Sequence, residues 1–349
     1  MDVRPLNGET DWRNCRAEVE ALEPAVAPNP WATWHHLHLA WRLAFPSAKC
    51  WLVMLNSHDG PVAAGIFREE ESRRSIKTVK TLRTLDWSTS NLPPLIVTPE
   101  RAAAAYCALV RRAGQLHRTT GAELFCLHQQ TESHADSLCM ALAEAGLPFR
   151  RLQTSASQII ETGPFKAENP RNKSRNVRRN EGKLCDAYKT SPVLFRTRGQ
   201  VYETAAQEGI WDDLDRLWRQ SWQNAYLESL EPGAGAKSFA YFYESLKEWS
   251  RRQWLDIAAL KLGPRVIAIY INLAIEGKVW LLLTLYDQQL ETYGVGSINL
   301  YKMLVDSTAR GDRELDFGGE ATEWKRRWST TERPVYQIEF ALGGPFGRL

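Results

Sequence analysis

The sequence has no cysteines at the short spacings that metal sites and redox motifs require. Its six cysteines, at positions 15, 50, 107, 126, 139 and 185, are scattered and include no Cys-x-x-Cys motif. This excludes zinc ribbons and thioredoxin-like motifs. We therefore expect reduced, mostly buried thiols, which are typical of a cytoplasmic protein.

Histidine is absent from everything beyond position 134, and long apolar runs are absent throughout. His35, His36 and His38 share one expected helix but have no further ligands at suitable spacing, so the sequence predicts no metal site. Without a run of about 18 apolar residues, no transmembrane helix is expected. The opening residues Met1–Pro5 do not resemble a signal peptide either. These absences together favour a cytoplasmic location.

A strong excess of either charge is also lacking. The net charge is +3, so the whole chain carries no nucleic-acid-binding signature, and any basic feature must be local. Hydrophobic residues make up 44% of the chain, enough for ordinary cores. A length of 349 residues suggests two domains rather than one.

The pattern of the first half predicts a mixed sheet flanked by helices. Two helices are followed by three strands, a helix, a strand, a helix and a last strand that ends at Glu161.

The second half repeats this order. Helices are expected over Trp211–Tyr226 and Ser238–Arg251, followed by a meander of three antiparallel strands over residues 254–286. A helix over Ile298–Ala309, a short strand and a final strand over Pro334–Leu342 complete it. The sequence thus predicts an α/β (mixed α+β) protein with tandem units. We expect one unit at residues 1–161, a basic helix and hinge at 162–200, and a second unit at 201–349.

The expected hinge carries a local concentration of positive charge. Residues 166–183 include seven lysines or arginines and two glutamates. At 100° per residue, Arg171, Arg175, Arg178 and Arg179 share one helix face. This face could bind phosphates or an anionic substrate. A solvated linker helix explains the same pattern, and both interpretations stay open.

A glycine pattern follows the second meander. Gly294, Val295, Gly296 and Ser297 lie between an expected strand and an expected helix. Backbone N–H groups of such a loop can face an anion at the helix N-terminus. Because the preceding strands are expected to be antiparallel, a dinucleotide-binding fingerprint is disfavoured.

Residues from about 165 to 342 resemble the GNAT acyltransferase superfamily, in particular the branch of the cellulose-biosynthesis protein CelD and the FemAB-like transferases. The resemblance rests on the basic helix at 173–179, the meander at 256–286, the Gly294–Gly296 turn, Asp316-Phe317-Gly318-Gly319, and the segment 324–328. It implies two GNAT-like folds and acyl transfer to an amine or hydroxyl.

The resemblance also implies a donor site. Acetyl-CoA or another acyl-CoA would place its pantetheine in a V-shaped gap between two strands. Its pyrophosphate would lie on Gly294, Val295, Gly296 and Ser297. At position 291, where GNAT motifs favour Gln or Arg, this sequence has Glu291.

Acyl transfer needs a route for a proton, and three residues are candidates for it. Glu320 and Asp316 lie at or just beyond a strand end, and either could act as the general base. Asp316 could instead hold the Gly318–Gly319 turn. Tyr293 could protonate the leaving thiolate.

The segment Trp324–Trp328 could contact the acceptor. Lys325 and Arg326 could bind a phosphate or a sugar acid, together with Arg175, Arg178 and Arg179. Alternatively they form a solvated basic strand. Trp324 could stack on a sugar ring or pack against the protein.

These features favour an acyl-CoA-dependent N- or O-acyltransferase that acts on a small-molecule or sugar acceptor, such as an exopolysaccharide or cell-envelope precursor. The runner-up is a FemAB-like transferase that uses aminoacyl-tRNA, for which the basic helix would be required. A catalytically silent binding module with the same fold is the third hypothesis, and Glu291 favours it.

Overall fold

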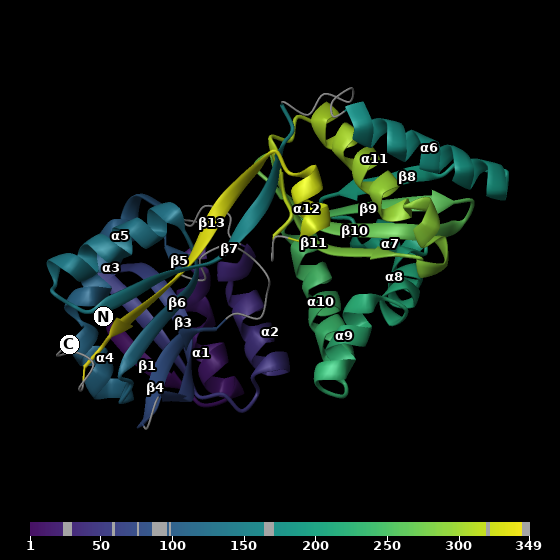
Figure 1. Cartoon of the computed structure of the whole chain (residues 1–349). Coiled ribbons are helices and arrows are strands. Elements are labelled where there is room, and N and C mark those ends of the chain that lie inside the picture. The colour runs from purple at the N-terminus through teal and green to yellow at the C-terminus, as the bar shows by residue number, and fades with distance from the viewer. Residues whose placement is uncertain are drawn as a thin grey trace. The chain divides into compact units, whose positions relative to one another are not determined.

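The computed structural model describes residues 1–23, 30–57, 60–74, 77–85, 96–97, 99–163, 171–318 and 322–343. The chain divides into two compact units (Figure 1). Unit 1 contains the described residues up to Ser157 and those from Arg333 onward. Unit 2 contains those from Gln158 to Gly318 and from Thr322 to Glu332. Compared with the boundaries expected from the sequence, the basic helix groups with unit 2 and most of the last strand groups with unit 1.

Unit 1 is a mixed sheet with helices on both faces. Its strands follow the order β1-β2-β3-β4-β6-β13, continued by residues 149–157 of β7, and from β1 to β13 neighbours are antiparallel except β4 and β6. The strands are β1 (Asp2–Leu6), β2 (Cys50–Ser57), β3 (Gly60–Arg74), β4 (Lys77–Thr84), β5 (Ile96–Val97), β6 (Leu124–Thr131) and β13 (Thr331–Ala341). The helices are α1 (Glu9–Glu20), the 3-10 turn η2 (Pro30–Ala32), α2 (Trp34–Ala44), α3 (Pro99–Arg111), α4 (Ala113–Thr120) and α5 (Glu132–Glu144).

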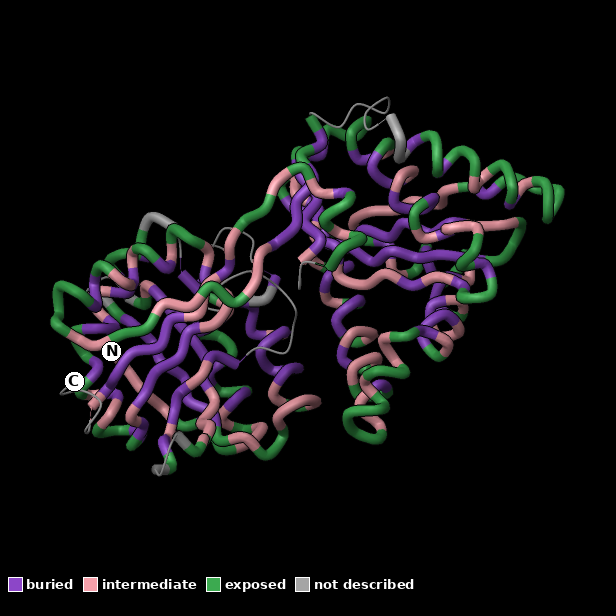
Figure 2. Tube along the Cα trace, viewed as in Figure 1, coloured by how far each residue is buried: buried purple, intermediate pink, exposed green. Residues whose placement is uncertain are grey.

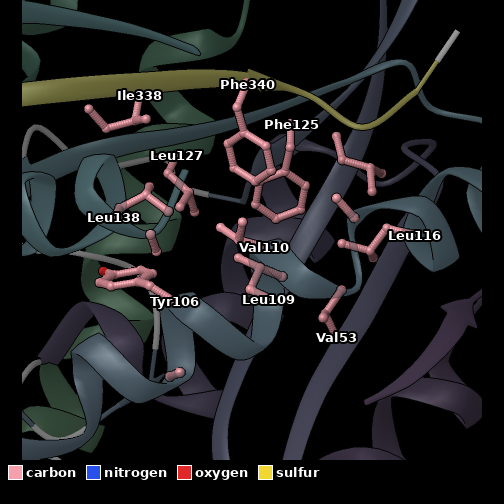
Figure 3. Packing of buried hydrophobic residues seen from close by; sticks show 14 of the residues in the cluster. Val53, Tyr106, Leu109, Val110, Leu116, Phe125, Leu127, Leu138, Ile338 and Phe340 are labelled. Atoms are coloured by element: carbon pink, nitrogen blue, oxygen red, sulfur yellow. The ribbon is translucent and has the colours of Figure 1, made fainter. Parts of the chain in front are cut away.

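Alternation along the strands of unit 1 divides its core between two sheet faces. On one face, Phe125 of β6 and Phe340 of β13 lie with ring centroids 5.2 Å apart. They pack against α3, α4 and α5, with Tyr106 and Leu138 among the contributing side chains (Figure 3). On the other face, α1 and α2 cover the sheet with residues such as Trp12.

Unit 2 is also a mixed sheet flanked by helices. Its strand order is β7-β12-β11-β10-β9-β8, and the described end of β7 that belongs to it is residues 158–161. The strands are β7 (Phe149–Glu161), β8 (Val193–Arg198), β9 (Leu255–Leu262), β10 (Arg265–Ile275), β11 (Lys278–Tyr286) and β12 (Glu314–Asp316). The helices are α6 (Arg171–Tyr188), α7 (Tyr202–Gln207), α8 (Ile210–Arg219), α9 (Trp222–Leu230), α10 (Ala234–Arg251), the 3-10 helix η3 (Gln288–Tyr293), α11 (Val295–Ala309) and α12 (Glu323–Trp328).

The predicted antiparallel meander is confirmed as β9, β10 and β11. Its two turns contain Gly263 and Gly277, whose φ angles of 60° and 76° suit glycine because it has no Cβ. The predicted arrangement of mixed, largely antiparallel sheets flanked by helices is likewise present in both units.

Three local expectations need correction. The helix expected over Trp211–Tyr226 is two helices: α8 ends at Arg219, and Ser221 caps α9 by accepting a hydrogen bond from the N–H of Asn224 at 3.1 Å. The expected hinge contains strand β8, which pairs with β9. The segment Trp324–Trp328 lies in helix α12 rather than in a strand, and Glu323 pairs with Arg327 one turn later.

None of the helices formed by the described residues combines the length and apolar character needed to cross a bilayer.

Candidate functional site

In unit 2 the parallel strands β11 and β12 part after a short pairing. Only three residue pairs join them, from Lys278 with Glu314 to Trp280 with Asp316. Strand β11 continues for six further residues to Tyr286. A register shift against β10 leaves Leu282 as an extra residue, which is a β-bulge. Bulges bend and twist a strand, and this one lies two residues beyond the last pair with β12.

The hydrogen-bond pattern of β11 shows which main-chain groups face the gap. The N–H of Asp287 donates to the carbonyl of Ile267 at 2.9 Å, which fixes the alternation along the ladder. Thr284 and Tyr286 therefore point their N–H and C=O groups away from β10, on the side where β12 ends. We call this side of residues 281–286 the open edge of β11. Such an edge can pair with an extended ligand.

The glycine pattern lies directly beyond the open edge. Gly294 has φ 62° and is the N-cap of α11, so the four-residue loop expected from the sequence is one left-handed residue and the first helical turn. The N–H of Ile298 makes the first bond within the helix, to the carbonyl of Gly294 at 3.0 Å. The N–H groups of Val295, Gly296 and Ser297 precede that bond. They form the positive end of the helix dipole, which favours an anion.

Buried polar contacts fix the backbone on both sides of Gly294. Asp287, whose side chain has no exposed surface, accepts a hydrogen bond from the N–H of Gln289 at 3.1 Å and pairs with Arg265. The hydroxyl of Tyr270 donates to the carbonyl of Gly296 at 2.8 Å. The start of α11 is therefore attached to β10 and to the end of β11.

Glu291 has an exposed side chain beside this loop. Its Oε1 accepts a hydrogen bond from the hydroxyl of Tyr286 at 3.4 Å. Burial, and secondly the charge of Glu291, raise the pKa of Tyr286. The ring of Tyr286 in turn lies 3.6 Å from where a Cβ of Gly296 would be. The carboxylate thus lies at the surface near the first turn of α11.

Helix α6 packs beside α11 and reaches the same loop (Figure 1). The side-chain nitrogen of Asn180 lies 2.9 Å from where a Cβ of Gly294 would be. Tyr293, the predicted acid, is half-buried and makes an edge-to-face contact with Tyr188 of α6, with centroids 6.2 Å apart. Glu181 of α6 pairs with Lys302 of α11 at 2.8 Å.

The predicted arginines lie on the outer side of α6. Val177 and Leu184 are buried, whereas Arg175, Arg178 and Arg179 are exposed. Figure 2 shows buried and exposed positions alternating along the chain. The structure shows no ion pair for these three arginines within the part of the chain that it describes. Arg175, Arg178 and Arg179 therefore form an exposed, positively charged face of α6, and the side chain of Arg171 lies outside the described residues.

The end of β12 forms the other side of the gap. Asp316 is buried, and its Oδ1 accepts a hydrogen bond from the N–H of Gly318 at 2.8 Å, as a turn-holding aspartate would. The Nζ of Lys325 donates to the carbonyl of Gly318 at 2.6 Å. Trp324 is 37% exposed and makes an edge contact with Phe317 at 5.3 Å. Arg326 is exposed. Glu320 lies outside the described residues.

A buried charge network behind the site was not anticipated. The guanidinium of Arg196 binds both oxygens of Asp256, at 3.1 and 2.8 Å, and also reaches Asp306 of α11 at 2.9 Å. Arg198 binds both oxygens of Asp312, at 2.8 and 2.7 Å. These pairs tie β8 and β9 to α11 and to the turn before β12. The Arg-x-Arg spacing in a strand was the sequence signal for it.

Residues 171–326 match the family model Acetyltransf_6, described as an acetyltransferase (GNAT) domain. The matched segment is less than half of the chain, and apart from residues 319–321 it lies in unit 2. It contains both parting strands, the glycine loop and α6. The GNAT resemblance expected from the sequence is thus supported at the level of this domain.

Similar solved structures extend over nearly the whole chain. L-PGS from Bacillus licheniformis is 12% identical over 92% of this chain and 90% of its own, with a TM-score of 0.52. A conserved protein of unknown function from Bacteroides thetaiotaomicron is 11% identical over 98% of this chain and 100% of its own, with a TM-score of 0.51. FemX is 12% identical over 97% of each chain, with a TM-score of 0.45. The first two of these similarities show a shared fold alone. No curated protein matches the sequence.

Proposed function

We propose that the protein is an acyl-CoA-dependent acyltransferase whose donor site lies in unit 2. The observation that carries this proposal is the short pairing of β11 with β12, followed after η3 by a first turn of α11 that has no side-chain cap. The amides of a pantetheine chain would pair with the open edge at Thr284 and Tyr286. The pyrophosphate would meet the N–H groups of Val295, Gly296 and Ser297.

The transfer step requires little more than this geometry and a proton route. A strand N–H at the open edge would polarise the thioester carbonyl. The amine or hydroxyl of the acceptor would attack that carbon, the C–S bond would break, and the thiolate would take a proton. We assign the acid to Tyr293, which lies next to Gly294, and the base to Asp316 or Glu320. Because Asp316 already holds the N–H of Gly318, the assignment favours Glu320.

For the acceptor we propose a sugar-containing precursor of an exopolysaccharide or of the cell envelope, as in the CelD-like branch. Trp324 and Arg326 support this choice. Both are exposed on α12, which is attached to the end of β12 through Lys325. An indole face can stack on a sugar ring, and a guanidinium can bind its acidic substituent.

Isothermal titration calorimetry with CoA, acetyl-CoA and longer acyl-CoAs tests the proposal. We expect binding that Gly296→Leu abolishes, because a leucine there must displace the ring of Tyr286 or project into the open edge. Circular dichroism serves as the folding control. Absence of binding for every acyl-CoA would reject the proposal. Binding without turnover of any acceptor would favour the silent binding module, for which Glu291 remains the supporting feature.

The second candidate is an aminoacyl-tRNA-dependent transferase. The exposed arginines of α6 favour it, because an RNA backbone would relieve their mutual repulsion. The triple variant Arg175→Glu, Arg178→Glu and Arg179→Glu is then expected to lose tRNA binding, and wild-type binding should weaken steeply with salt. A protein that binds CoA and is indifferent to tRNA would exclude this candidate.

A further inference from the structure

One main-chain hydrogen-bonding group of the open edge is already bound by a side chain. The Nε2 of Gln223 donates a hydrogen bond to the carbonyl oxygen of Thr284 at 3.0 Å. By the alternation of the β10–β11 ladder, that carbonyl points away from β10 into the gap. Gln223 comes from helix α9, which is distant in sequence and is not part of the glycine motif.

The bond made by Gln223 has the chemistry of a strand pairing. An amide N–H donates to a main-chain carbonyl, which is the contact that a ligand amide would make at the same position. The carbonyl oxygen has two lone pairs, but a ligand amide that pairs along the open edge would have to share it with the Nε2 of Gln223, which weakens both bonds. A pantetheine chain that pairs with Thr284 would therefore compete with Gln223.

Helix α9 has little buried surface, which makes this competition feasible. None of its residues is buried. Trp222, Tyr226 and Leu230 are each more than half exposed. Its contacts are mainly with α8 and α10. An element with so little buried apolar surface opens at low free-energy cost.

We propose that Gln223 is a displaceable latch on the donor site: its side-chain amide holds the Thr284 carbonyl and yields to the amide of an incoming acyl-CoA. This inference rests on the proposed function. The latch lowers donor affinity, because its hydrogen bond must break before the donor can pair. It also couples donor binding to release of α9 from the strand.

The test compares Gln223→Ala and Gln223→Asn with a matched variant, Ser229→Ala, on the same helix. Asparagine keeps the amide but is one methylene shorter, so it should not reach Thr284. Calorimetry measures the Kd for CoA and for adenosine 3′,5′-bisphosphate, which lacks the pantetheine amides. We expect both Gln223 variants to bind CoA about two- to tenfold more tightly, which corresponds to one net hydrogen bond. The bisphosphate affinity and the Ser229→Ala protein should be unchanged.

The outcomes separate the latch from the proposed function. Equal or weaker CoA binding by both Gln223 variants, when the wild type binds CoA, overturns the latch and leaves the donor site standing. Tighter binding of the bisphosphate to the same degree also overturns it, because the effect would then not depend on pantetheine amides. If neither the wild type nor the variants bind CoA, the proposed function fails and the latch fails with it. Binding by the variants alone supports the latch.

Discussion

The two glycines before α11 are expected to respond to alanine in opposite ways. Gly294 has φ 62°, a conformation that costs an L-residue about 1–2 kcal/mol. Its added Cβ would also lie 2.9 Å from the Asn180 side chain, which must move. Gly296 lies inside the helix, and its Cβ would meet the Tyr286 ring at an ordinary contact distance of 3.6 Å. Gly296→Ala should therefore stabilise the fold by about 0.5 kcal/mol.

Donor affinity should separate the same two variants. If the Gly294→Ala loop leaves the left-handed conformation, acyl-CoA must restore it on binding, and up to about 1.4 kcal/mol of the strain then appears as a tenfold weaker Kd. The part of the strain that does not appear in affinity must appear as lost stability. For Gly296→Ala we expect a Kd within about twofold of the wild type, because its Cβ fits without strain.

Urea denaturation gives the stability changes, and calorimetry with CoA gives the affinities. A Gly294→Ala protein that loses neither stability nor affinity would refute the argument from φ. If Gly296→Ala were destabilised as strongly as Gly294→Ala, the claim that an added Cβ fits beside Tyr286 would be refuted. The Ser229→Ala protein, altered away from the loop, serves as the reference for both measurements.

Three further outcomes follow from charge and burial. Glu291→Gln should bind CoA up to about fivefold more tightly at low salt, because an exposed charge near the phosphates is worth at most about 1 kcal/mol. This gain in affinity should fade at high salt, and an unchanged Kd at low salt would contradict the placement of this carboxylate. Asp312→Asn should cost about 3 kcal/mol in urea at pH 7, because Arg198 would lose a buried partner. Burial alone would raise the pKa of Asp312, but the hydrogen bonds from Arg198 outweigh burial and the pKa is lowered. The stabilisation by Asp312 is therefore present above about pH 4 and is lost as pH falls further. If Asp312→Asn still differed from the wild type by the full amount of unfolding free energy at pH 2, this reasoning would be contradicted. Burial raises the pKa of Cys15 to about 11 and of Cys50 to about 12, so neither thiol should react with a disulfide reagent at pH 8 until the protein unfolds.

The sequence predicted those parts of unit 2 that depend on neighbouring residues. Glycine turns at Gly263 and Gly277 separate three apolar runs, so the meander follows from local turn chemistry. The helical pattern before Gly311 similarly predicted most of α11. Helix α12 could have been recognised in the same way. Its Glu323 and Arg327 lie one turn apart, whereas the basic run had been considered as a solvated strand.

The open edge could not be predicted, because it depends on pairing between distant segments. Nothing around Leu282 indicates a bulge, since the register shift is defined against β10. The three-residue overlap with β12 joins residues more than thirty positions apart. Likewise, the bond from Gln223 to Thr284 spans two elements whose proximity no local pattern encodes.

The glycine motif illustrates why a pattern alone was weak support for an anion site. The pattern placed both glycines in one anion-binding loop, but in the structure they have separate roles. Gly294 provides the left-handed residue that starts α11, and Gly296 leaves room beside Tyr286 while its carbonyl is held by Tyr270. A helix N-terminus that starts in this way is common and has no ligand specificity of its own. Specificity for an acyl-CoA would come from the adjoining open edge, because only a ligand with both an anionic end and an extended amide chain can use the two features together. A simple phosphate should therefore bind far more weakly than CoA, and equal affinities would show that the strand edge contributes nothing.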